Sequence, residues 1–154
     1  MLGLAHGVLR VLDEQNAVYM QFNFVEREWH GETFPAFYQR MFSFADSVEA
    51  DYFVLDLRYN SGGDGSMLIP FLHKFIKRDQ INRPGHFITL VGRKTFSAAV
   101  MLFDYLKDHT HTLFAGEPPG AARNHYGDAT SVTLPNSQFR LNISTLYHQL
   151  STPK

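Results

Sequence analysis

An alternation of short apolar runs with helical patterns constrains the fold of this chain more than any other feature of its sequence. Runs rich in β-forming residues occupy 17–25, 52–58, 86–92 and 111–116. Between them, at 32–50, 67–77 and 97–109, apolar residues recur every three or four positions, as on one face of a helix. This order predicts parallel strands joined by right-handed crossover helices. The continuous apolar runs "YFVLDLR" and "HFITLVG" further predict strands buried on both faces of the sheet.

The last part of the chain has a different pattern. "TSVTLP" and "FRLNIST" flank Asn136 and Ser137 and predict an antiparallel hairpin. A length of 154 residues, of which 44% are hydrophobic and 19% charged, suits a folded chain with a sizeable core. We therefore expect residues 1–154 to form a single α/β domain with a small hairpin appendage.

Composition excludes several classes of function. Fourteen basic and fifteen acidic residues leave no overall charge that would attract nucleic acid. No apolar run approaches the length of a membrane span. The chain has no cysteine, which rules out disulfides, thiolate catalysis and zinc sites with cysteine ligands. We expect no cofactor and no metal.

A glycine-rich loop follows the strand at 52–58. In "RYNSGGDGS", at 58–66, adjacent glycines allow backbone N–H groups to turn toward one point just before a helix begins. Such a turn can hold an anion or a developing oxyanion. The loop lacks the residues of a Walker motif and the spacing of a dinucleotide-binding motif, so it predicts neither.

Ser97 stands in the next loop, in "VGRKTFSAAVMLFDYL", directly before a helical pattern. Serine is a favoured N-cap residue, and on spacing alone this role is sufficient. Both loops follow parallel strands, however, so they should lie at the same sheet edge. A hydroxyl beside backbone donors is the minimum geometry for acyl transfer, and the sequence leaves the two roles of Ser97 open.

Taken together, these segments resemble a known family. "YFVLDLRYNSGGDG", "ITLVGRKTFSAAVMLFDYL", "TLFAGEPPGA" and "VTLPNSQFRLNIS" are similar to the C-terminal processing, or tail-specific, serine peptidases and their tricorn-like and retinoid-binding-protein-like relatives. The resemblance covers residues 17–150. It implies a crotonase-like, Clp-protease-like spiral of ββα units, followed here by the C-terminal hairpin.

The resemblance also implies roles for individual residues. It makes Ser97 the nucleophile and the N–H of Ala98 one oxyanion donor, with the second donor from Gly62 or Gly63. Other polar residues of the first loop have structural explanations. Asp56 and Arg58 lie two apart on a strand, where both side chains project to one face and can form an ion pair. Asn60 is expected to tie the turn to itself.

The general base is the part of the pattern that differs. Where the processing peptidases have a lysine, "GEPPGAAR" places Ala121, which cannot accept a proton. Lys94 has the position of a solvated lysine at a strand end. The internal candidate is His125, which Asp128 or Glu117 could orient, with a hydrogen-bonded loop anchor as its alternative role. The tricorn-like branch instead uses a histidine and a carboxylate from segments that this sequence does not match.

Two functions follow. In the first, the chain is the core of a serine peptidase that cleaves peptides or proteins, works with other domains of a longer protein, and has little activity alone. In the second, the same scaffold binds an apolar ligand or a peptide without chemistry. A crotonase-like acyl-CoA enzyme is a weaker third reading, because such enzymes need no serine at the helix start. Members of the family often work outside the cytoplasm. His109 and His111 suggest a metal edge only by their spacing, since no third ligand accompanies them.

Overall fold

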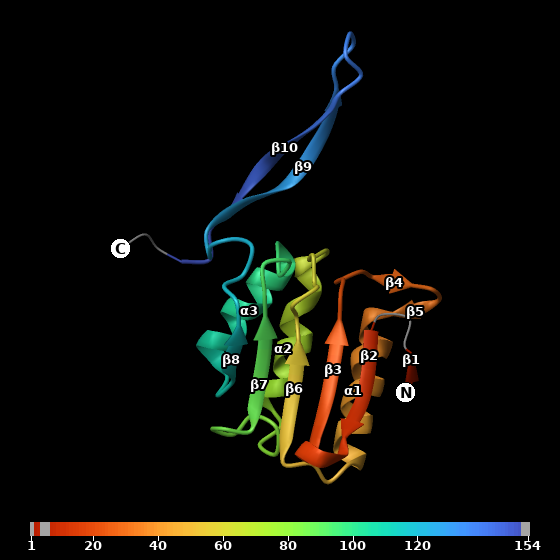
Figure 1. Cartoon of the computed structure of the whole chain (residues 1–154), viewed down its shortest axis with the longest axis vertical. Coiled ribbons are helices and arrows are strands. Elements are labelled where there is room, and N and C mark those ends of the chain that lie inside the picture. Colours follow the sequence, from red (N-terminus) through yellow and green to blue (C-terminus); the bar gives the residue numbers. More distant parts are fainter. Residues whose placement is uncertain (1, 4–6, 152–154) are drawn as a thin grey trace.

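A computed structural model describes residues 2–3 and 7–151 of the chain (Figure 1). It contains three α-helices and ten strands among these residues. The helices are α1 (Phe34–Ser47), α2 (Leu68–Ile76) and α3 (Ala98–His109). The strands are β1 (Leu2–Gly3), β2 (Gly7–Leu12), β3 (Ala17–Phe22), β4 (Glu28–Trp29), β5 (Glu32–Thr33), β6 (Tyr52–Asp56), β7 (Phe87–Val91), β8 (Leu113–Gly116), β9 (His125–Thr133) and β10 (Arg140–His148). Two short 3-10 helices occupy Asp13–Gln15 and Gly65–Met67.

Six of the strands form one mixed sheet in the order β1-β2-β3-β6-β7-β8. The four strands from β3 to β8 are parallel and are joined by α1, α2 and α3, whereas β1 and β2 pair antiparallel at one edge. The alternation in the sequence therefore predicted the parallel part of the sheet correctly. The first predicted strand is shorter than expected, because β3 ends at Phe22 and Val25 only makes an isolated bridge to Gly63.

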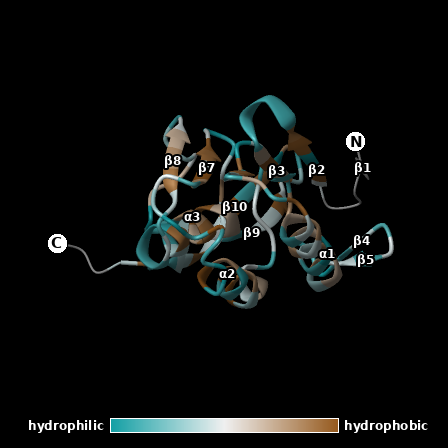
Figure 2. Ribbon diagram, turned by 90° about the horizontal axis from the view of Figure 1, so that it is seen from below, coloured by the Kyte–Doolittle hydropathy of each residue, from teal (hydrophilic) through white to brown (hydrophobic). Residues whose placement is uncertain are grey.

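All three helices lie on one face of the sheet (Figure 2). The prediction that β6 and β7 are buried on both faces is wrong within the part of the chain that the structure describes. Phe53, Leu55 and Phe87 are buried against the helices, whereas Val54 and Ile88, on the opposite face, are only partly buried. A continuous apolar run shows that both faces of a strand are hydrophobic. Whether each face is buried depends on the helices or strands that pack against it.

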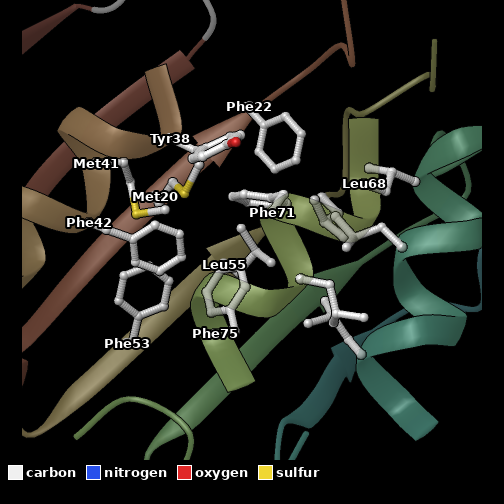
Figure 3. Close-up of a cluster of buried hydrophobic side chains, with 14 of the residues drawn as sticks. Met20, Phe22, Tyr38, Met41, Phe42, Phe53, Leu55, Leu68, Phe71 and Phe75 are labelled. Atoms are coloured by element: carbon white, nitrogen blue, oxygen red, sulfur yellow. The ribbon is translucent and has the colours of Figure 1, made fainter. Parts of the chain in front are cut away.

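The core between the sheet and the helices is built largely from phenylalanine. Phe22 from β3, Phe71 and Phe75 from α2, and Phe53 from β6 are almost wholly excluded from solvent (Figure 3). The rings of Phe22 and Phe71 meet edge to face with centroids 5.6 Å apart, a favourable arrangement for aromatic pairs. This rigid layer fixes the strands whose carboxyl ends carry the loops described below.

Strands β9 and β10 form a separate hairpin that projects beyond the carboxyl ends of the parallel strands (Figure 1). It extends farther toward the body of the protein than the sequence predicted, so that His125 pairs with His148 at its base. Within the described residues, no helix combines the length and apolar character that crossing a membrane requires. Because the hairpin projects from the edge of the sheet at which the loops after β6 and β7 lie, its base and these two loops can together assemble a site.

Candidate functional site

Two hydrogen bonds join the loops that follow β6 and β7. The buried hydroxyl of Thr95 donates to the carbonyl of Leu57 at 2.7 Å, and the N–H of Phe96 donates to the carbonyl of Asn60 at 3.0 Å. The Thr95 hydroxyl also accepts a hydrogen bond from the N–H of Gly92 at 3.0 Å. The two loops consequently form one unit at the sheet edge, and Thr95 is a structural residue that sequence reasoning missed.

The glycine-rich loop is held closely from both sides. Asn60 is buried, and its side chain donates to the carbonyl of Phe22 and accepts from the N–H of Gly62, at 3.0 and 2.9 Å. Gly63 has a φ of +135°, and a Cβ at this position would lie 2.0 Å from the carbonyl oxygen of Val25. Both the backbone conformation and the close approach therefore require glycine at residue 63.

Ser97 is not an ordinary helix cap. Its backbone lies at φ 52° and ψ −124°, and its side chain makes no capping hydrogen bond to α3. N-cap residues normally have extended backbones, and a positive φ at a residue with a side chain is strained. A strained residue at a sharp turn from strand to helix is typical of an exposed nucleophilic serine, because the turn lifts the hydroxyl away from the backbone.

Two backbone N–H groups beside Ser97 have no acceptor among the described residues. They belong to Ala98, the first residue of α3, and to Gly63. The N–H of Gly62 is different, because it already donates to the side chain of Asn60. The expected contribution of Gly62 is therefore corrected: its missing side chain lets the loop pack against Ser97, where a Cβ would come within 2.7 Å of Ser97 Cβ. Of the two glycines, Gly63 is the one whose N–H has no acceptor among the described residues.

Asp56 and Arg58 form an ion pair that supports the start of the loop. Arg58 Nη2 donates to Asp56 Oδ2 at 2.7 Å, and the hydroxyl of Tyr19 donates to the same oxygen at 2.6 Å. Burial acts to raise the pKa of Asp56, but the hydrogen bonds from Arg58 and Tyr19 outweigh it and hold this pKa below its ordinary value. Burial and the bond to the carboxylate raise the pKa of Tyr19 to about 12. The hydrogen bonds among Tyr19, Asp56 and Arg58 thus link β3 to the end of β6.

A cavity of about 430 Å³ opens in front of Ser97. It is lined by residues 63–66, Ser97, Met101, Asp128 and His148. Asp128 and His148 come from the base of the hairpin, where His148 Nε2 lies 2.8 Å from Asp128 Oδ2. Sequence reasoning missed His148. The turn predicted at Asn136 and Ser137 nevertheless contains the information, because counting residues outward from it along both strands pairs His148 with His125.

His125 does not line this cavity. It is buried, and its Nδ1 lies 3.1 Å from the carbonyl oxygen of Ala122, within reach to donate a hydrogen bond. Its ring packs against those of Phe96 and His148, with centroids 5.9 and 5.3 Å away. Asp128, expected as a possible partner of His125, pairs instead with His148. These contacts fit the loop-anchor role of His125.

The other candidates lie elsewhere. Lys94 Nζ is 5.3 Å from the centre of the Tyr59 ring, and this lysine lines a different cavity together with Arg58 and Arg93. The carboxylate of Glu117 pairs with Arg93. Among the described residues, no three histidine, aspartate or glutamate side chains are grouped so as to hold a metal ion, and His109 and His111 are exposed.

Comparison with known proteins addresses the fold of this arrangement. No family model and no curated protein sequence matches the chain. Several solved structures do. The photosystem II D1 C-terminal processing protease is 21% identical with a TM-score of 0.58, covering 86% of this chain and 38% of its own. A candidate S41 protease from Bacteroides fragilis is 15% identical with a TM-score of 0.58, covering 96% and 46%. A candidate peptidase from Parabacteroides merdae is 16% identical with a TM-score of 0.63, covering 86% and 49%.

The chain has the fold of C-terminal processing peptidases. It spans about half the length, or less, of these three structures. The mixed α/β sheet with its crossover helices is shared with these structures, and Ser97 stands in it just before a helix and beside a glycine-rich loop.

Proposed function

We propose that this chain carries the nucleophile and the oxyanion-binding groups of a serine peptidase that acts on peptide or protein substrates. The strained and uncapped backbone of Ser97 is the observation that carries the proposal. Helix capping would leave this serine in a relaxed extended conformation, so the strain has no explanation in stability alone. The expected crotonase-like spiral of ββα units and the cooperation with other domains of a longer protein belong to the same proposal.

The chemistry follows from the groups around the cavity. Ser97 Oγ attacks the carbonyl carbon of a peptide bond, and the electron pair of the carbonyl moves to its oxygen. The N–H groups of Ala98 and Gly63 donate to this oxyanion. Each donor of this kind typically contributes about 100-fold to 1,000-fold in rate. Collapse of the intermediate releases the amine and leaves an acyl group on Ser97, which water then removes.

A fluorophosphonate probe tests the nucleophile separately from the rest of the peptidase reaction. We expect the protein to gain the mass of one adduct, carried by the peptide that contains Ser97, and Ser97→Ala to gain none. Ser66→Ala discriminates between the two serines of the cavity. Labelling of Ser66, or equal labelling of Ser97→Ala, contradicts the assignment. A parallel incubation with a mixture of peptides, followed by mass spectrometry, tests whether an active serine also cleaves peptide bonds.

The second candidate is a module that binds a peptide or an apolar ligand without chemistry. The observation that favours it is the hairpin, which exposes large apolar side chains along both strands and its turn: Tyr126, Val132, Leu134, Phe139, Leu141, Ile143, Leu146 and Tyr147. An exposed apolar surface of this kind is typical of an interaction site. A folded protein that binds peptides equally well with serine or alanine at residue 97, and takes up no probe, supports this function instead.

A further inference from the structure

The proposed nucleophile needs a proton acceptor, and one imidazole stands among the described residues that line the cavity. Ala121 stands where the resembling peptidases have a lysine, and Lys94 lines another cavity. His148, by contrast, lines the same cavity as Ser97. Its side chain is 19% exposed, so it is sheltered but still reached from the cavity. The free nitrogen of a neutral imidazole can accept a proton and return it, as a general base must.

The hydrogen bond between His148 and Asp128 prepares the imidazole for this task. Nε2 lies 2.8 Å from Asp128 Oδ2, so in the neutral ring Nε2 carries the hydrogen and donates it to the carboxylate. Nδ1 then keeps a free lone pair, and it makes no hydrogen bond within the described residues. This is the division of labour of a serine hydrolase triad, in which the carboxylate fixes the tautomer and the opposite nitrogen takes the proton.

The backbone around Asp128 is shaped for this contact. Asp128 lies within β9 at a φ of 50°, at a point where the regular pairing of β9 with β10 is interrupted. The other positive-φ residues with side chains, apart from Ser97, lie in the connections between strands: Asn16, His30 and Gln138. Residues held in such sparsely populated backbone conformations are frequent at active sites. The two remaining positive-φ residues with side chains, Ser97 and Asp128, thus line one cavity.

The base of the hairpin is anchored to α3, the helix that follows Ser97. Arg123, just before β9, pairs with the buried carboxylate of Asp104 and with Asp108, both on α3. Asn124, the next residue, ties the two strands together at the base of the hairpin, because its Oδ1 accepts hydrogen bonds from the N–H groups of Leu150 and Ser151 at 2.9 and 3.0 Å. The residues that follow β10 are therefore tied to the start of β9, and the position of His148 relative to α3 is defined.

We propose that His148 is the general base for Ser97 and that Asp128 positions its ring. This inference rests on the proposed function. In the first step Ser97 Oγ bonds to the substrate carbonyl carbon and its proton passes to His148 Nδ1. When the C–N bond breaks, this proton moves to the leaving amine. A water molecule then gives a proton to His148 as it attacks the acyl group, and Ser97 Oγ takes that proton when it leaves.

Few charged groups from the described part of the chain surround this imidazole. Asp128 and His125 face it from β9, and Asp64 faces the cavity from the glycine-rich loop. Asp64 is already paired, since it accepts from Arg27 Nε at 2.9 Å and from the Ser66 hydroxyl at 2.5 Å. From α3 the cavity receives only Met101. Asp128 is thus the carboxylate that directly contacts the ring.

The test is the rate of fluorophosphonate labelling as a function of pH. In the unaltered protein the rate should rise with pH as the general base loses its proton. We expect His148→Gln to lower the rate roughly 100-fold or more and to remove the rise. His111→Gln, a change at an exposed histidine beyond the far end of α3, should label like the unaltered protein. In His148→Ala, added imidazole should restore part of the rate, which a merely structural role of His148 would not allow.

The positioning role of Asp128 has its own readout. Asp128→Asn should slow labelling, and Asp128→Glu should retain more of the rate than Asp128→Asn because it keeps a carboxylate. The inference is overturned if folded His148→Gln labels at the unaltered rate, or if His125→Gln rather than His148→Gln removes the rise with pH. Failure of the proposed function looks different, because then the unaltered protein takes up no probe or Ser97→Ala still does.

Discussion

Adding one methyl group at Gly62 tests whether the glycine-rich loop is built around Ser97. The backbone of Gly62 has a φ of +100°, and a Cβ would lie 2.7 Å from Ser97 Cβ and 2.8 Å from the backbone N of Ala98. The left-handed conformation costs a residue with a side chain roughly 1–2 kcal/mol. Forcing an extra methyl into a packed site costs about 1–3 kcal/mol more. Gly62→Ala should therefore lower the free energy of unfolding by roughly 2–5 kcal/mol.

Gly31→Ala is the matched control. Gly31 has a φ of +79°, but a Cβ there would have no neighbour within 4 Å, so only the conformational cost of roughly 1–2 kcal/mol remains. Urea unfolding measures both changes, and the fluorophosphonate rate measures the site. We expect Gly62→Ala to slow labelling of Ser97 in the folded protein and Gly31→Ala to leave it unchanged. Equal destabilisation by the two variants, or an unaltered labelling rate in Gly62→Ala, refutes the packing argument.

Three further predictions concern groups that support the site. Thr95→Val keeps the shape of a buried side chain but removes two hydrogen bonds to backbone, so urea unfolding should show a loss of about 1–3 kcal/mol. Burial and the bond to Asp56 raise the pKa of Tyr19 to about 12, so the protonated hydroxyl stabilises the fold fully below about pH 10 and this contribution is lost as the pH rises toward 12; Tyr19→Phe should destabilise the protein at pH 8 and lack this alkaline decline. Gly127→Ala would place a Cβ 2.9 Å from His148 Nε2, so it should slow labelling while leaving the protein folded.

The sequence was sufficient for the parallel sheet because hydrophobic spacing records which residues must leave water. Phe53, Leu55 and Phe87 form one buried face, and the crossover helices cover it. It was not sufficient for the second face, where Val54 and Ile88 are equally apolar but only partly buried. A strand pattern cannot say which other element, if any, covers a face.

The residues of the candidate site were predictable where a single loop has a recognisable local sequence. They were not predictable where the site depends on contacts between two separate segments. Ser97 and the glycine pair stand out in local sequence. The strained backbone of Ser97 does not, because a serine before a helix ordinarily predicts a cap. The pairing of His148 with Asp128 depends on the register of the hairpin and on its interruption at one residue, and a shift by one position turns a side chain to the opposite face. Sequence reasoning therefore identified the correct hairpin but selected His125, whereas its partner on the neighbouring strand, His148, faces the cavity.

The structure of the phosphonylated protein tests the central claim most directly, because one measurement locates the nucleophile, the oxyanion donors and the base together. The account predicts phosphorus bonded to Ser97 Oγ, with a phosphonyl oxygen about 2.7–3.1 Å from the backbone nitrogens of Ala98 and Gly63. It also predicts His148 beside the same adduct. Phosphorus on another residue, or a phosphonyl oxygen turned away from both nitrogens, would contradict it.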